Sequence, residues 1–194
     1  MLKKILITLI VILVAITAFI AKQPEDFSVS RNTVINASAS DIFANINDFH
    51  QWEIWSPWAR IDSNVKNTFE GSENGVGAVL RWSSDNREVG EGGMTIIEST
   101  PNQFIKIGLE MIKPVASSNI IEFSFKEENG QTTLTWTMQG KRNFIAKAMS
   151  LIFNCDKIIG QKFDEGLANI KGIFEGDVTA EDDDSKEESE EAAK

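Results

Sequence analysis

Side chains suited to proton transfer are few in this sequence, and one stands in an aromatic-rich stretch, FHQWEIWSPW at residues 49–58. His50 is the chain's only histidine, and imidazole is the side chain best suited to exchange protons near neutral pH. Such a group can move a proton at a carbonyl-stabilised carbanion. His50 lies between Asp48 and Gln51, a setting typical of a helix end, so we expect a capping or surface role and assign no catalytic residue. The other acid or base candidates are Glu53, Glu70, Glu91 and Glu98.

Trp52, Trp55 and Trp58 fall within the same stretch. Such a cluster suits a stacking platform for nucleic acid or sugar, the rim of a ligand site, a membrane-interface belt or a core. Outside the two ends of the chain the net charge is close to zero, so no basic patch favours nucleic acid. We predict that Trp52 packs inward, and packing, ligand contact and bilayer contact stay open for the cluster.

Recognisable cofactor and metal motifs are missing from the sequence. Cys155 is the only cysteine, so an internal disulfide is impossible, and one histidine cannot build a histidine-rich metal site. There is no P-loop, no GxGxxG opening a helix, no GxSxG and no internal repeat. We therefore expect no cofactor and no metal.

The N-terminus carries the features of a membrane anchor. Ile5 to Ala21 is a run of 17 residues without charge, at the short end of what spans a bilayer. Lys3 and Lys4 precede it, which favours a cytoplasmic N-terminus. We predict a single-pass signal anchor at 1–22 in the cytoplasmic (inner) membrane, with the following domain on the extracytoplasmic (periplasmic) side. A cleaved signal peptide is the alternative, but Phe19 or Ile16 would stand at the −3 position of a cleavage site, where a small residue is needed.

The rest of the chain divides into a linker at 23–26, a body at 27–176 and an acidic end at 177–194. The last 18 residues hold nine acids and two lysines and no large apolar residue after Val178. Such a segment buries too little apolar surface to offset its ordering entropy, so we expect a disordered tail. The body of roughly 150 residues suits one domain.

The apolar residues of the body recur with the spacing of strands in some segments and with the spacing of helices in others. Phe27–Ile35 has strand alternation, and Ser38 or Ser40 can cap a short helix, after which a second short helix carries Trp52. Phe144–Glu175 has helical spacing and no proline, so we expect one long helix that bends near Gly160. Six further strands are expected at Asn67–Glu70, Gly77–Ser83, Glu91–Ser99, Gln103–Lys113, Asn119–Glu127 and Gln131–Lys141.

These elements and four phrases resemble the SRPBCC superfamily of START-like proteins, in the polyketide cyclase/dehydrase branch. The phrases are TVINASASDIFANINDFHQWEIWSPW, GVGAVLRW, GEGGMTI and FDEGLANIK. The resemblance implies an α+β helix-grip fold, in which a curved seven-stranded antiparallel sheet wraps around the long C-terminal helix and encloses a hydrophobic cavity. That superfamily has no universal catalytic residue set, so the resemblance transfers no catalytic role.

Strand alternation predicts which side chains face the helix. They are almost wholly apolar and rich in aromatic residues and methionine, which suits either a filled core or an adaptable cavity wall. The predicted cavity residues are Trp52, Trp55, Trp58, Leu80, Trp82, Met94, Ile96, Ile107, Leu109, Met111, Ile121, Phe123, Phe125, Leu134, Trp136, Met138, Met149, Ile152, Cys155 and Ile159.

Three functions follow as hypotheses. The first is a membrane-anchored module that binds a small hydrophobic molecule such as a lipid, an isoprenoid or an acyl chain. The second is a cyclase- or dehydratase-like enzyme that uses the same cavity, which the sequence favours less because it offers no catalytic constellation. The third is a protein-interaction domain with a filled core, whose partner the sequence does not identify.

Overall fold

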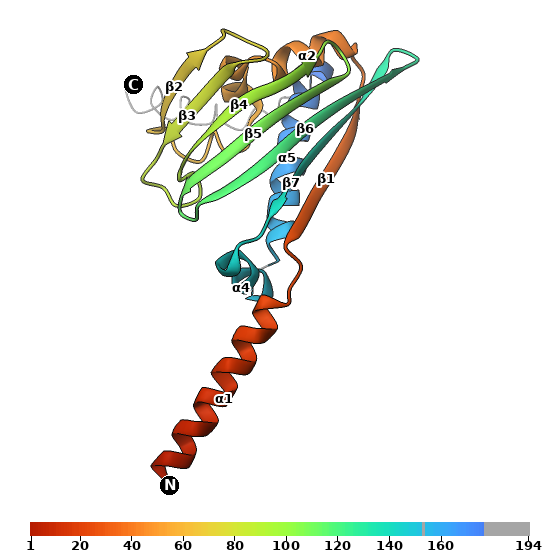
Figure 1. The fold of residues 1–194 in the computed structure, drawn as a ribbon. Coiled ribbons are helices and arrows are strands. Elements are labelled where there is room, and N and C mark those ends of the chain that lie inside the picture. The colour runs from red at the N-terminus through yellow and green to blue at the C-terminus, as the bar shows by residue number, and fades with distance from the viewer. Residues whose placement is uncertain (153, 177–194) are drawn as a thin grey trace, which may run out of the picture.

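The structure is a computed structural model that describes residues 1–152 and 154–176. The predicted disordered tail, 177–194, lies outside the described residues. Helix α1 (Leu2–Ala21) extends away from the remainder of the chain as a straight rod (Figure 1). The helix has 20 residues, none of them buried, and an 18-residue window within it has a mean hydropathy of 2.8, so it is long and apolar enough to cross a membrane. At 1.5 Å per residue it reaches about 30 Å, the thickness of a bilayer's hydrocarbon core.

In the described part of the chain, seven strands form one curved antiparallel sheet, which confirms the predicted α+β architecture. The order across the sheet is β1-β7-β6-β5-β4-β3-β2, so the first strand pairs with the last one. The observed ends differ from the predicted ends by only a few residues. The strands are β1 (Asp26–Ile35), β2 (Lys66–Gly71), β3 (Ala78–Ser83), β4 (Glu91–Thr100), β5 (Phe104–Lys113), β6 (Ser117–Glu128) and β7 (Gln131–Lys141).

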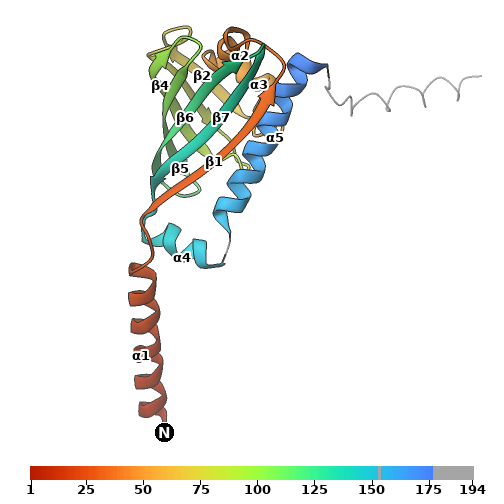
Figure 2. The same ribbon diagram turned by 90° about the vertical axis from the view of Figure 1, so that its right-hand side faces the viewer.

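Short helices close the end of the sheet that lies away from α1 (Figure 2). They are α2 (Ala39–Ile46), the 3-10 turn η1 (Phe49–Gln51) and α3 (Trp52–Trp55). The Ser38 hydroxyl accepts the backbone N–H of Asp41, so of the two predicted candidates, Ser38 and Ser40, it is Ser38 that caps α2. Ile42 and Ile46 are fully buried, and the indole of Trp52 donates to the carbonyl of Ile46 over 3.0 Å. These contacts fix the tryptophan-bearing turn on the sheet.

The predicted single helix over Phe144–Glu175 is wrong, because the structure has two helices there. Helix α4 (Phe144–Ile152) ends early, and α5 (Cys155–Glu175) begins behind an N-cap at Asn154, whose side chain accepts the N–H of Lys157. An asparagine side chain that can accept the first backbone N–H groups of a helix favours the start of a new helix at this position over continuation of the previous one. The break therefore lies at Asn154 and not near Gly160.

Gly160 and Gly166 let α5 lie close to the sheet. The guanidinium of Arg31 on β1 lies against the open side of Gly160 and pairs with Asp164 one turn later, at 3.2 Å. A Cβ at Gly166 would lie 2.8 Å from the Trp136 ring and 3.0 Å from Pro57. Glycine thus serves close approach of the helix, rather than bending, at both positions.

Alanine at these two glycines should give opposite results. Either change gains about 1 kcal/mol of helix propensity. At Gly166 the methyl group meets two rigid, buried rings, and overpacking of about 1–3 kcal/mol outweighs that gain. At Gly160 it displaces only the half-exposed end of Arg31, whose ion pair contributes at most about 1 kcal/mol. We expect urea unfolding to find Gly166→Ala destabilised and Gly160→Ala equal to wild type or more stable; equal losses at both sites would contradict this packing.

A candidate ligand cavity under helix α4

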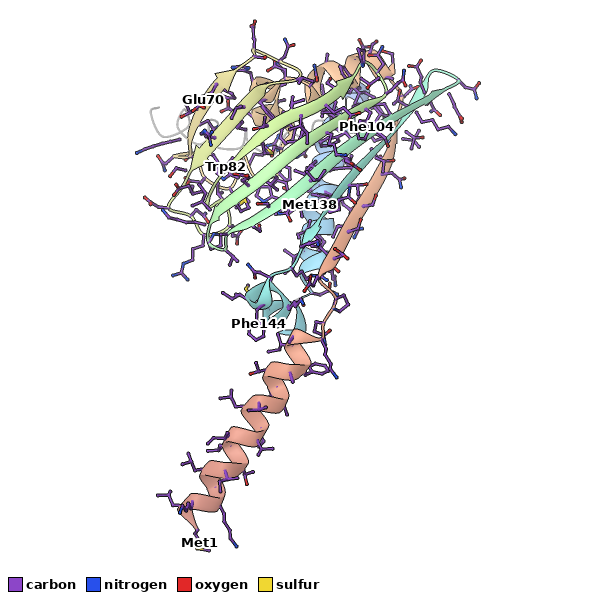
Figure 3. The ribbon with its side chains drawn as sticks, in the orientation of Figure 1. Met1, Glu70, Trp82, Phe104, Met138 and Phe144 are labelled. Atoms are coloured by element: carbon purple, nitrogen blue, oxygen red, sulfur yellow. The ribbon has the colours of Figure 1, made fainter. Side chains whose placement is uncertain are left out.

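A cavity of about 420 Å³ lies between the sheet, α3, α4 and the first turns of α5. This volume falls in the range of small-molecule sites, and most of the lining is apolar. Figure 3 locates two of its walls, Trp82 on β3 and Met138 on β7. The structure brings together twelve of the predicted cavity residues here: Trp52, Trp58, Leu80, Trp82, Met94, Leu109, Met111, Ile121, Trp136, Met138, Met149 and Ile159.

Other predicted cavity residues form a filled core instead. Trp55 and Phe123 are fully buried, and their rings meet edge to face with centroids 6.2 Å apart. Trp55 also meets Trp136 at 5.6 Å, so three large aromatic rings occupy this half of the sheet. The side chains of Ile152 and Cys155 lie outside the described part of the structure. The predicted residues that the structure places in the filled half are Trp55, Ile96, Ile107, Phe123, Phe125 and Leu134.

The break between α4 and α5 explains why one half of the sheet is open. A continuous helix would have continued along the sheet past the ends of β5 and β7. Instead α5 begins only at Cys155, and α4 turns away toward α1 (Figures 1 and 2). Leu109, Met111 and Met138 on those strand ends consequently face the cavity and not a packed helix.

The tryptophan cluster is divided between core and cavity. Trp55 is fully buried, whereas Trp52 is buried and also lines the cavity. Trp58 is half-buried, and its ring lies edge to face with Phe163 at 6.5 Å on the cavity wall. Helix α3 lies at the end of the sheet away from α1 (Figure 2), which separates the cluster from the apolar N-terminal helix. Packing and cavity contact therefore explain the cluster better than bilayer contact does.

One buried polar side chain in the cavity wall was missed by the sequence reasoning. Asn119 on β6 is 9% exposed, and its Nδ2 donates to the Ser117 hydroxyl over 3.2 Å. Among the described residues, its Oδ1 has no hydrogen-bond partner. Gly140 lies opposite on β7, where any Cβ would collide with this carboxamide. The sequence does contain a signal for this residue, because strand alternation puts Asn119 on the same inward face as Ile121 and Phe123.

Charged residues gather where β7 leaves the sheet, beside α4. Arg142 donates to Asp156 over 2.6 Å, and its guanidinium lies 5.2 Å from the centre of the Phe27 ring. Both ions border the cavity together with Lys141 and Asn143. Because Arg142 is matched by a carboxylate and by an aromatic face, it rigidifies the mouth rather than offering a free cation.

The acid and base candidates do not converge on the cavity. The His50 ring contacts the Asp48 carboxylate at 2.8 Å and stacks on Phe69 with ring centroids 4.1 Å apart; Phe69 lines the cavity, but His50 itself does not. Partial burial raises the pKa of the Asp48 carboxyl, but hydrogen bonds from His50 and Gln51 outweigh burial and hold that pKa below its usual value. Of the five candidates, only Glu53 borders the cavity.

Two of the remaining carboxylates pair with basic side chains on the surface. Glu70 lies 3.3 Å from Arg81, and Glu91 lies 2.6 Å from Lys113. The hydrogen bond to Glu91 raises the pKa of the Lys113 ammonium group. Within residues 1–152 and 154–176 no group of three or more His, Cys, Asp or Glu side chains is placed to hold a metal ion.

Comparisons with known proteins place the fold. No protein-family model matches the chain, and no curated protein matches its sequence. The Aha1 dimer from Colwellia psychrerythraea superposes with a TM-score of 0.54 and 13% identity, over 77% of this chain and 96% of that one. The Mll3558 protein from Rhizobium loti gives 0.54 and 18%, over 76% and 99%. KanY gives 0.56 and 16%, over 78% and 99%. Likeness at these identities shows the fold alone, and that fold is the helix-grip fold.

Two tryptophan substitutions should separate the open half from the filled half. Leu109 borders free volume, so Leu109→Trp should leave the free energy of unfolding nearly unchanged. Phe123 is fully buried among rings, so Phe123→Trp should lower it by about 1–3 kcal/mol through overpacking. Chemical unfolding of the two variants checks this, and an equally large loss at Leu109 would mean that no usable volume exists there.

Proposed function

We propose that the protein is a membrane-anchored START-like domain of the SRPBCC superfamily, in the polyketide cyclase/dehydrase branch, that binds a small hydrophobic ligand. The cavity carries this proposal: about 420 Å³ with mostly apolar walls of methionine, leucine and tryptophan side chains. Such walls adapt to flexible apolar molecules and gain free energy by removing them from water. An unfilled volume of this size also argues against the alternative of a filled-core interaction domain.

The polar groups of the wall suggest what kind of ligand fits. The free Asn119 oxygen and the buried indole nitrogen of Trp136 lack partners among the described residues. Buried polar groups left unpaired are unfavourable, and the Asn119 oxygen lies against Gly140, so a ligand gains affinity and specificity when this side chain turns its oxygen toward the cavity to pair with it. A lipid, isoprenoid or acyl chain with one small hydrogen-bonding end suits both the apolar walls and the unpaired polar groups.

Helix α1 supplies the proposed anchor, and 23–26 the linker to the domain at 27–176. Lys3 and Lys4 at its N-terminal end favour the cytoplasmic side for that end, which supports a domain on the extracytoplasmic (periplasmic) face of the cytoplasmic membrane. The enzyme alternative rests on the carboxylates that border the cavity, Glu53, Glu88 and Asp156. Asp156 is paired with Arg142, and among the described residues the carboxylates of Glu53 and Glu88 form no ion pair or hydrogen bond, which favours binding over proton-transfer chemistry.

The full-length chain, purified in mild detergent, should carry a stoichiometric apolar adduct in native mass spectrometry. Leu109→Trp fills the cavity and should abolish the adduct without unfolding the domain. Val76→Trp is the matched control, because Val76 is 56% exposed in the turn between β2 and β3 and should leave the adduct intact. Solvent extraction then identifies the molecule. A mass without adduct, even after incubation with a lipid extract, would contradict ligand binding.

Asn119→Leu should separate polar from apolar recognition. Leucine keeps the size of the side chain but removes the hydrogen-bonding group. Loss of one such bond, at about 1–1.5 kcal/mol, should weaken binding of a long-chain alcohol by about tenfold. The alkane of the same length forms no hydrogen bond, so it should bind to the Asn119→Leu variant at least as tightly as to the wild type. Competition against a fluorescent fatty-acid probe measures both affinities, and an equal change for alcohol and alkane would rule out this role for Asn119.

A further inference from the structure

Helix α4 has the reverse polarity of a helix that faces water. Phe144, Ile145, Met149 and Leu151 are 48%, 59%, 40% and 46% exposed, and at 100° per residue they fall on one side of the helix. Its lysine, Lys147, is 6% exposed and lies one turn before Leu151 at the edge of this apolar side, and Ser150 is half-buried on the opposite side. A helix that hides its charge and exposes its apolar residues is suited to apolar surroundings.

The hidden lysine joins α4 to the end of α1. The Lys147 ammonium lies 3.1 Å from the Glu25 carboxylate and 3.4 Å from the carbonyl oxygen of Ala21, the last residue of α1. The backbone N–H of Arg142 also donates to the carbonyl of Glu25, over 2.6 Å. These bonds hold α4 against the point where the membrane-crossing length of α1 is complete.

The orientation of α4 relative to α1 also suits a helix at the membrane surface. Figure 2 shows α4 running across the end of α1, between that helix and the sheet, and Figure 3 locates Phe144 at this level. A helix perpendicular to a membrane-spanning helix lies parallel to the bilayer plane. The exposed apolar side chains of α4 are therefore at the depth of the boundary between headgroups and acyl chains.

The same helix forms part of the cavity wall. Ala146 and Met149 line the cavity, and Asn143 borders it just before α4 begins. Met149 is also 40% exposed, so its side chain reaches both the cavity and the outer apolar face. Cavity and exposed apolar face thus meet along one side chain.

We propose that α4 is an interfacial helix that lies in the membrane spanned by α1, so that the cavity opens onto lipid and not onto water. This inference rests on the proposed function for the anchor and deepens it by assigning the route of the ligand. An apolar molecule passes from the acyl-chain layer past Met149 into the cavity without crossing the aqueous phase. The bilayer is chosen over a protein partner because the bonds of Lys147 make the exposed face of α4 continuous with α1.

The test measures the surroundings of three labelled positions in the full-length chain reconstituted into phosphatidylcholine–phosphatidylglycerol vesicles. Cys155 is the only native cysteine, so Cys155→Ser gives a background in which Ile145→Cys, Ile12→Cys and Val76→Cys each accept one bimane fluorophore. All three positions are exposed, at 59%, 49% and 56%, so the substitutions leave the core intact. Iodide in the buffer and brominated lipid in the bilayer then compete as quenchers.

We expect the label at Ile145 to behave like the one in α1 at Ile12, with loss of iodide quenching and strong quenching by brominated lipid. The label at Val76, in the turn far from α1, should show the reverse. If Ile145 is quenched by iodide as strongly as Val76 while Ile12 is shielded, the interfacial role of α4 is overturned and the anchor and ligand site stand. Shielding of Ile145 from both quenchers would mean that protein covers α4, which also overturns it. If Ile12 itself is open to iodide, the proposed anchor fails together with this inference, whereas the adduct experiment decides ligand binding separately.

Discussion

The placement of α5 on the concave face of the sheet determines the rest of this structure. Phe163 stacks on Trp136 with ring centroids 4.1 Å apart and planes 11° from parallel, and Gly166 lets the helix backbone approach the same indole. A curved sheet with one apolar face needs such a cover, and a single helix cannot cover all of it. Because α5 is seated beside β1 and over Trp136, one half of the face is filled by rings and the other half is left to α4.

The concave face of the sheet combines a densely packed half with a half that encloses free volume. The aromatic residues of α3, β6 and β7 meet one another around Phe123 and supply the large contact area that a core of this size requires. Methionine and leucine are concentrated toward the opposite strand ends, where Met111 and Met138 face the cavity. The rigid aromatic rings thus lie where the core is densely packed, and the flexible methionine and leucine side chains lie where the cavity wall can adapt.

Most of the sheet could be predicted from sequence, because a strand in contact with both core and solvent must alternate. The predicted inward register of Ile121, Phe123 and Phe125 is confirmed, and Ser38 is the one of the two candidate caps that the structure uses. The break at Asn154 was missed, because the apolar spacing of Phe144–Glu175 continues through it and neither proline nor glycine marks it. Which inward residues line free volume could not be predicted either, since Leu109 and Phe123 have the same alternation and differ only in what lies above them.

The connection between α1 and β1 limits how far the domain can move. Ala21 ends the helix and Asp26 begins the strand, so the free segment is four residues long and reaches at most about 14 Å when extended. Asp26 pairs with Lys141 in the register of β1 and β7, so the chain enters the sheet from α1 and leaves it toward α4 at adjacent positions at the same end of the sheet. With α1 in a membrane, as proposed, a domain held in this way could not tumble freely or drift from the surface. Its search for the proposed ligand would take place in two dimensions, at the high local concentration that a short tether imposes.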